Sequence, residues 1–307
     1  MVVKTKFTKK DFDKVLTNYN IGKYKSHKHL DWVLGSQVYE LVTTKGKYIL
    51  KLLNDIKSMK KQLELIDYLY QNKILVVKNI KSINDKEVFK FQNKNIIIQD
   101  FVEGSHPKTY PNALIIDIAK NISKMHKVLI KNKNEDKKIK FKREILSKDT
   151  EKIIVDKSNG LNNQLNNINQ IRLKKAIIHN DLSEVNLLVK NNKLKSFIDW
   201  DDFGYNILVN DISVFIAHSF IRTKLVKKAK IKLFLKEYQK LIKLNSEEKK
   251  AVYYLVKYRI FGILQWYIKY RKERKDKLDE LEKGYIRNLA RLERFDKISL
   301  KVFLTYF

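Results

Sequence analysis

The first hundred residues alternate between the helical and the strand period. Residues 7–19 predict an amphipathic helix, because Thr8 is a good N-cap and apolar residues then recur on one face. Residues 60–71 repeat this helical pattern. The remaining apolar runs are short, rich in branched and aromatic residues, and separated by polar turns. They predict one antiparallel sheet of five or six strands, at 32–34, 38–42, 48–52, 74–77, 88–91 and 95–99.

From Pro111 onward the pattern is mainly helical. Both prolines, Pro107 and Pro111, lie where the strand pattern ends, as expected at a boundary. We therefore predict an amino-terminal lobe over 1–101 and a carboxy-terminal lobe over 102–307. Helices are predicted at 113–129, 211–222, 224–243, 246–272 and 276–295. Many aromatic residues fall in the 246–272 helix, where aromatics at this spacing are usually core residues.

A polar loop at 179–186 interrupts the helical lobe. It lies between two short apolar runs, 176–178 and 187–189, which are typical of buried strands. A third run, 195–198, follows the turn-like Lys-Asn-Asn-Lys segment, so the second and third runs predict a hairpin. Such a hairpin would bring the polar residues at its open end close together.

The polar residues at that end are Asp181, Asn186 and Asp199, with Asp201 following. Phosphoryl transfer from ATP requires a carboxylate that orients and deprotonates a hydroxyl, and oxygen ligands that hold magnesium. Asp181 would be the base, Asn186 and Asp199 the magnesium ligands, and Asp201 an additional carboxylate. Asp and Asn also favour turns, but the spacing of the whole set and its apolar flanks favour the phosphotransferase interpretation.

These residues resemble the signature of the aminoglycoside phosphotransferase and choline kinase family: Ile-His-Asn-Asp at 178–181, Asn186, and Ile-Asp-Trp-Asp at 198–201. The resemblance implies an α+β, two-lobed protein-kinase-like fold, with an amino-terminal antiparallel sheet and helix and a mainly helical carboxy-terminal lobe that carries the catalytic hairpin. It also implies ATP and Mg²⁺ as cofactors. In such a fold His179 supports the loop, and Asp211 braces it.

The same resemblance assigns roles in the amino-terminal lobe. Lys51 lies in the third predicted strand and would contact the nucleotide phosphates, and Gly35 belongs to the turn that would cover them. Glu64 is the candidate partner of Lys51, although Gln62 could occupy that place. Adenine would bond to backbone groups near Gln99 and Phe101.

Composition limits the remaining interpretations. The 307 residues include 65 basic and 34 acidic ones, a net charge of +31, and no cysteine. Disulfides and thiolate metal sites are therefore excluded. The basic surplus raises the possibility of polyanionic partners, but lysines are spread along the chain, which favours a compositional bias over a nucleic-acid partner. No run approaches the ~20 apolar residues of a membrane span, and a charged amino terminus suggests a cytoplasmic protein. Nothing indicates a particular oligomeric state.

The preferred hypothesis is an ATP- and magnesium-dependent kinase. Its acceptor would be the hydroxyl of a small metabolite, an amino alcohol or hydroxy amino acid such as choline, ethanolamine or homoserine. The single glycine of the predicted phosphate turn leaves open a catalytically inactive nucleotide-binding regulator of the same fold. A basic nucleic-acid-associated protein is the third alternative, and it depends on charge alone.

Overall fold

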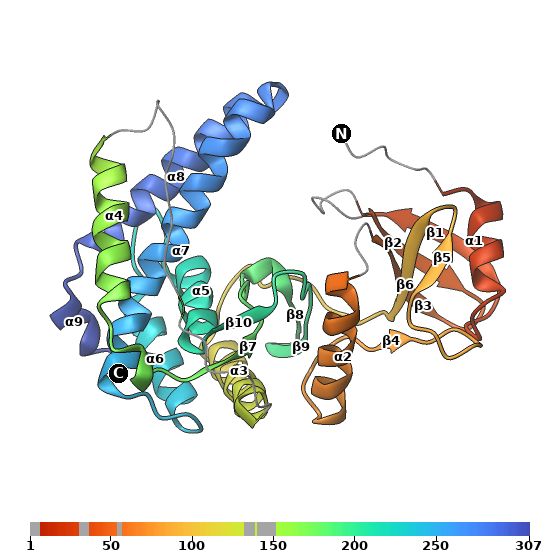
Figure 1. Cartoon of the computed structure of the whole chain (residues 1–307), viewed down its shortest axis with the longest axis horizontal. Helices are drawn as coiled ribbons and strands as arrows, with labels where there is room; N and C mark the ends of the chain where they lie inside the picture. The colour runs from red at the N-terminus through yellow and green to blue at the C-terminus, as the bar shows by residue number, and fades with distance from the viewer. Residues whose placement is uncertain (1–6, 31–36, 54–56, 132–138, 140–151) are drawn as a thin grey trace. The chain divides into compact units, whose positions relative to one another are not determined.

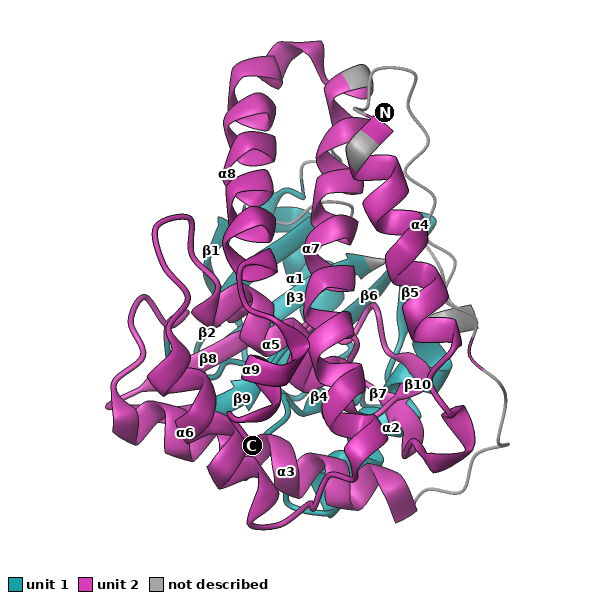
Figure 2. Cartoon of the chain, turned by 90° about the vertical axis from the view of Figure 1, so that its left-hand side faces the viewer, with its two compact units in different colours: residues 1–104, 195–198 teal, residues 105–194, 199–307 magenta. Residues whose placement is uncertain are grey.

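The computed structural model describes residues 7–30, 37–53, 57–131, 139 and 152–307. The chain forms two compact units, which Figure 2 shows in different colours. Unit 1 comprises residues 1–104 and 195–198, and unit 2 comprises residues 105–194 and 199–307.

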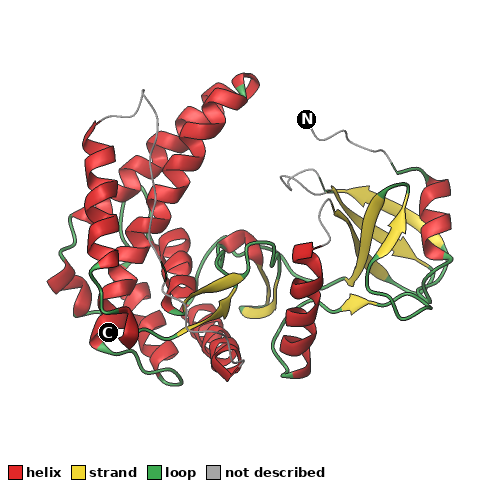
Figure 3. Ribbon diagram, viewed as in Figure 1, coloured by secondary structure: helices red, strands yellow, loops and turns green. Residues whose placement is uncertain are grey.

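Unit 1 is built on an antiparallel sheet (Figure 3). In the described residues the sheet has six strands in the order β1-β2-β3-β6-β4, with β5 paired to β6. The strands are β1 (Tyr24–His29), β2 (Gln37–Thr43), β3 (Lys47–Leu53), β4 (Asn79–Ile80), β5 (Phe89–Phe91) and β6 (Lys94–Asp100). Its helices are α1 (Lys9–Leu16) and α2 (Lys57–Gln71). The predicted five- or six-stranded sheet is thus confirmed.

The core of unit 1 explains why these segments form a sheet. The alternating pattern puts Leu41 and Leu50 on the buried face, where both are fully inaccessible to solvent. Helix α1 covers them through Phe12 and Val15, which belong to the same core cluster. The predicted N-cap is confirmed: Thr8 and Asp11 form a reciprocal capping box at the start of α1.

Two of the predicted strands of unit 1, at 32–34 and 74–77, do not correspond to strands of the described sheet. The strand predicted at 32–34 lies outside the described residues. Strand β1 was not predicted because its sequence, Tyr-Lys-Ser-His-Lys-His, is polar and half-exposed. The strand predicted at 74–77 is wrong. Helix α2 ends at Gln71, Lys73 then has a left-handed conformation (φ 59°), and Ile74 and Val76 are buried as part of the loop that follows. Their apolar character serves packing, and the paired strand comes later, at β4.

Unit 2 is mainly helical (Figure 1). Its α-helices are α3 (Asn112–Lys131), α4 (Lys152–Asn166), α5 (Val209–Phe220), α6 (Lys228–Gln239), α7 (Ser246–Glu273), α8 (Leu278–Asp296) and α9 (Leu300–Leu304). Helix α7 packs against α5 and α8, and α3 packs against α6. The five predicted helices of this part are confirmed, while α9 was not predicted. None of the helices in the described part of the chain is both long and apolar enough to cross a membrane.

Short strands position the polar loop of unit 2. Strand β7 (Lys175–Ile178) pairs antiparallel with β10 (Gly204–Ile207), and Ile178 lies opposite Gly204. Strands β8 (Leu187–Lys190) and β9 (Lys193–Phe197) form the predicted hairpin. Strand β10 was not predicted, but its pairing fixes the residues that follow Ile178 beside the start of β10.

Candidate active site

Asp211 holds the loop that follows β7. Its side chain is fully buried on α5 and accepts hydrogen bonds from two successive backbone N–H groups, of His179 to Oδ2 (3.2 Å) and of Asn180 to Oδ1 (2.7 Å). The ring of His126 also bonds to Oδ2 through Nε2 (3.1 Å), and its Nδ1 contacts the Tyr238 hydroxyl (2.8 Å). A buried carboxylate with three such partners fixes the backbone that leads into Asp181.

Asn180 is the second fixed point of this loop. Its φ is +66°, in the left-handed region that Asn tolerates better than most residues. Its Nδ2 donates to the carbonyl of Asp202 (3.0 Å), and its Oδ1 accepts from Asn206 (2.9 Å) and Asn210 (3.2 Å). One side chain therefore joins the loop to the segment after Trp200, to β10 and to α5.

Replacing Asn180 should separate its backbone role from its side-chain role. We expect Asn180→Ala to lower the free energy of unfolding by about 2 to 3 kcal/mol, because the side-chain hydrogen bonds of Asn180 are lost and Ala is strained at positive φ. Asn180→Gly loses the same hydrogen bonds without that strain and should recover about 0.5 to 1 kcal/mol. Urea denaturation measures both values. Equal losses in the two variants would exclude a contribution from the backbone conformation.

Asp181 and Asn186 are in direct contact. A 3₁₀ turn over Glu184–Asn186 follows the loop, so the five-residue spacing folds Asn186 back onto Asp181. The Asn186 Nδ2 donates to the backbone carbonyl of Asp181 and to its Oδ2, both at 2.8 Å. The Asp181 side chain keeps 21% exposure, so a small molecule can reach it. The structure thus brings together two residues that the sequence analysis assigned to one site.

Asp199 follows β9 and has φ +61°, which is rare for a residue other than glycine. Its neighbour Trp200 is buried and its ring lies 4.5 Å from the ring of His179. This contact attaches the Asp199 segment to the Asp181 loop and gives buried His179 a structural role. Asp201 is exposed. Partial burial, and then the charge of Asp181, raise the pKa of Asp202, so the two carboxyl groups lie close enough to influence each other's ionisation.

This region offers hard oxygen atoms of the kind that bind magnesium. Because the amide nitrogen of Asn186 points to Asp181, its Oδ1 is directed elsewhere, and no described residue donates to it. Asp199 supplies a carboxylate nearby in the chain. No group of three His, Cys, Asp or Glu side chains suited to a metal occurs among the described residues. A site with few protein ligands, all of them hard oxygens, is what magnesium prefers.

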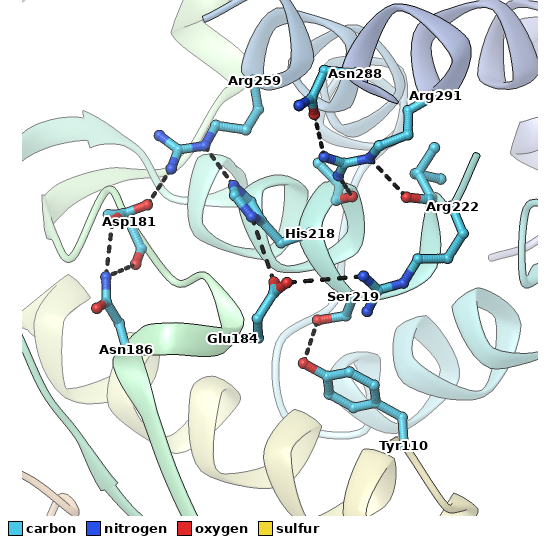
Figure 4. Close-up of polar contacts among 12 residues, drawn as sticks. Tyr110, Asp181, Glu184, Asn186, His218, Ser219, Arg222, Arg259, Asn288 and Arg291 are labelled. Atoms are coloured by element: carbon cyan, nitrogen blue, oxygen red, sulfur yellow. Dashed lines mark hydrogen bonds and ion pairs between the residues drawn. The ribbon is translucent and has the colours of Figure 1, made fainter. Parts of the chain in front are cut away.

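Arg259 is the residue of this site that sequence analysis missed. It lies on α7, 78 residues after Asp181, and its Nη2 donates to Asp181 Oδ1 (Figure 4). Its Nε donates to Nε2 of His218 (3.0 Å), and Nδ1 of that ring faces Glu184 Oε2 at 3.5 Å. A charged residue between Tyr258 and Ile260, within a largely apolar stretch of helix that also contains Lys257, was the available signal.

His218 and Glu184 hold Arg259 in place: the His218 ring accepts the Arg259 Nε–H, and the Glu184 carboxylate faces the other side of that ring. Burial lowers the pKa of His218, the contact with Glu184 opposes this, and the Arg259 and Arg291 charges lower the pKa further, so the net shift favours the neutral ring that can accept the Arg259 N–H. Burial opposes the ionisation of Glu184, but the interactions with His218 and Arg222 outweigh it and lower the pKa of Glu184.

The predicted nucleotide residues lie in unit 1. Lys51 is half-buried on β3, with Val38 and Ile97 as its cross-strand neighbours. No ion pair joins Lys51 to Glu64 in the described residues, and Glu64 is exposed on α2 whereas Gln62 is buried. The Lys51–Glu64 pairing therefore stays a prediction.

The other nucleotide residues lie in β6, directly after it, or outside the described part. Gln99 is buried and its Nε2 donates to Asn79 Oδ1 (2.8 Å). Phe101 lies under the Lys47 ammonium, 5.3 Å from the ring centre. Gly35 lies outside the described residues. The adenine and phosphate contacts of these residues remain predictions.

Solved structures with a similar fold are small-molecule kinases. An amicoumacin kinase in complex with AMP-PNP and Ca²⁺ is 17% identical, covers 94% of this chain and 92% of its own, and has a TM-score of 0.70. A microcompartment-associated aminopropanol kinase is 14% identical, covers 96% and 98%, and has a TM-score of 0.73. These likenesses confirm the predicted fold class.

Sequence comparison leads to the same group. Amicoumacin kinase of Bacillus subtilis (strain 168) is 24% identical over an alignment of 201 residues, and the match covers 58% of this chain and only 59% of that relative. The profile of the phosphotransferase enzyme family matches residues 31–238. That match covers more than half of the chain and includes Asp181, Asn186, Asp199 and Asp211, so the chain belongs to the phosphotransferase enzyme family.

Proposed function

We propose that the protein transfers the γ-phosphoryl group of ATP to a hydroxyl of a small metabolite, with Mg²⁺ as cofactor. The observation that carries this proposal is the Asp181 carboxylate, which Asn186 holds at the end of a loop that Asp211 fixes to α5. A positioned carboxylate beside a metal-ligand amide is the arrangement that phosphoryl transfer requires.

Asp181 would accept the proton of the acceptor hydroxyl. A carboxylate offers about four lone-pair sites, and the described residues occupy two of them, from Asn186 and Arg259. A hydroxyl can therefore bind without displacing either partner. As its oxygen bonds to the γ-phosphorus, the bond from that phosphorus to the β-phosphate oxygen breaks, and the products are a phosphate monoester, ADP and a proton.

Magnesium, when bound, would neutralise charge on the phosphates, and Asn186 Oδ1 and the Asp199 carboxylate would hold it. In unit 1 the proposal assigns Lys51 to the phosphates and the backbone near Gln99 and Phe101 to adenine. The names of the relatives, amicoumacin kinase and aminopropanol kinase, support a small acceptor. They are compatible with the amino alcohols and hydroxy amino acids that we propose.

The test is ATP consumption by the purified protein in the presence of Mg²⁺. The acceptor panel comprises choline, ethanolamine, homoserine, methylthioribose, simple sugars and one aminoglycoside, with Asp181→Asn as control. Turnover that depends on one acceptor and is lost in the variant supports the proposal. ATP binding without turnover on any acceptor would instead favour the regulator.

Metal removal should stop the reaction. We expect a chelator to abolish turnover and added Mg²⁺ to restore it. Asn186→Ala should raise the half-saturating Mg²⁺ concentration about 10-fold or more, because it removes a metal ligand. Asn210→Ala is the matched control, since Asn210 donates only to the Asn180 side chain. A shift of the same size in both variants would show that Asn186 acts through the loop and does not bind the metal.

A further inference from the structure

A positively charged side chain, that of Arg259, lies next to Asp181, the candidate base. Arg259 contacts Asp181 from α7, and its side chain remains 27% exposed. An acceptor hydroxyl that bonds to Asp181 would lie within about 6 Å of this guanidinium, because both groups would contact the same carboxylate through bonds of about 2.8 Å. Whatever group adjoins the transferred hydroxyl must therefore be compatible with a positive charge.

The guanidinium of Arg259 is held in one orientation. Its Nε–H is bonded to the partly buried ring of His218, which in turn faces Glu184. A surface ion pair with Asp181 would not need this support. An arginine whose plane is fixed loses little entropy on binding, and its donors match the two oxygens of a carboxylate.

Arg259 also keeps donors for a ligand. Only its Nε and Nη2 are engaged, and no described residue accepts a hydrogen bond from Nη1. The neighbouring arginines differ in this respect. Arg291 directs its donors to the carbonyls of Ala217 and Ile221 at the end of α5 and to Asn288, a C-capping role. The Arg222 Nη1 lies 3.9 Å from the Glu184 Oε1, on the side of Glu184 that faces away from His218 (Figure 4).

We propose that Arg259 is the specificity-determining residue of the acceptor site and binds a carboxylate of the acceptor. This inference rests on the proposed function and narrows it: the acceptor is a hydroxy acid or hydroxy amino acid, and not a purely cationic amino alcohol. An ammonium group in the same place would face a fixed guanidinium of like charge, which disfavours binding.

Matched acceptors that differ only by a carboxylate test the proposal. Homoserine is compared with 3-aminopropan-1-ol, and serine with ethanolamine, each by kcat/KM. We expect the wild type to prefer the carboxylate member of at least one pair by about 10-fold or more. Arg259→Gln should raise KM for that member about 10- to 100-fold, because it removes hydrogen bonds to a charged group. KM for the decarboxylated member should stay the same or fall.

Two control variants separate binding from structural effects. Arg259→Lys keeps the positive charge but loses the planar pair of N–H donors that matches a carboxylate. It should therefore retain only part of the preference for the carboxylate member. Arg222→Gln removes a cation from the same cluster away from Asp181 and should leave the preference intact. Turnover of the amino alcohols in preference to their carboxylate partners would overturn the inference and leave phosphoryl transfer standing. Phosphorylation of no hydroxyl compound in either this set or the wider panel would overturn both.

Discussion

Asp181→Asn is expected to lower kcat about 10³-fold on the best acceptor, while KM for ATP changes little. The substitution keeps the shape of the side chain and its contact with Asn186, but an amide cannot take the proton of the acceptor hydroxyl. The Asp181–Arg259 pair is partly exposed on both sides, so its loss should cost about 1 kcal/mol or less of stability. Initial rates of ADP formation, with urea denaturation of the same samples, measure both effects.

Asp202→Asn is the matched control for this variant. It removes a carboxylate whose charge interacts with that of Asp181, and it leaves the Asp202 carbonyl that accepts the Asn180 hydrogen bond unchanged. We expect kcat to stay within a few-fold of the wild-type value. If Asp181→Asn retained a tenth or more of the wild-type kcat, Asp181 would not be the base.

Asp211→Asn is expected to lower the free energy of unfolding by about 3 kcal/mol. The buried carboxylate accepts hydrogen bonds at both oxygens, from the backbone of His179 and Asn180 and from the His126 ring. An amide nitrogen at either position would face an N–H group and leave a buried donor unsatisfied. The urea midpoint should fall with an unchanged m-value.

The same change should also reduce turnover at temperatures where the protein stays folded, since the Asp181 loop loses its attachment to α5. We expect kcat to fall at least 10-fold. Ser213→Ala is the control on the same helix: it removes a buried hydroxyl that donates to the Val209 carbonyl (2.7 Å) within α5, and it should cost about 1 kcal/mol without affecting kcat. A loss below 1 kcal/mol for Asp211→Asn would refute its bracing role.

The part of the site that could be predicted consists of residues that lie close together in the sequence. Asp181 and Asn186 are five residues apart, and one 3₁₀ turn is enough to bring them together. His126 shows the opposite case. It lies among the apolar residues of α3 and is buried, but its ring also bonds Asp211, 85 residues away. Periodicity indicates that a side chain is buried, and it does not indicate which buried group it meets.

Local sequence by itself determined the larger elements of this protein. Periodic apolar faces specify α3, α5, α7 and α8, because each such helix must bury its stripe. The loop at 179–186 is specified by polar residues between strongly apolar runs. Segments with weak patterns, such as β1 and β10, form strands only because a neighbour supplies the hydrogen bonds.

Only the tertiary structure decided what surrounds Asp181. The packing of α7 against α5 places Arg259 on Asp181 and beside His218. These residues are separated by 41 to 78 positions, so no local spacing connects them. The physical reason is that apolar faces decide how helices pack against each other. The charge beside Asp181 depends instead on a single polar residue, Arg259, which this packing places in the site.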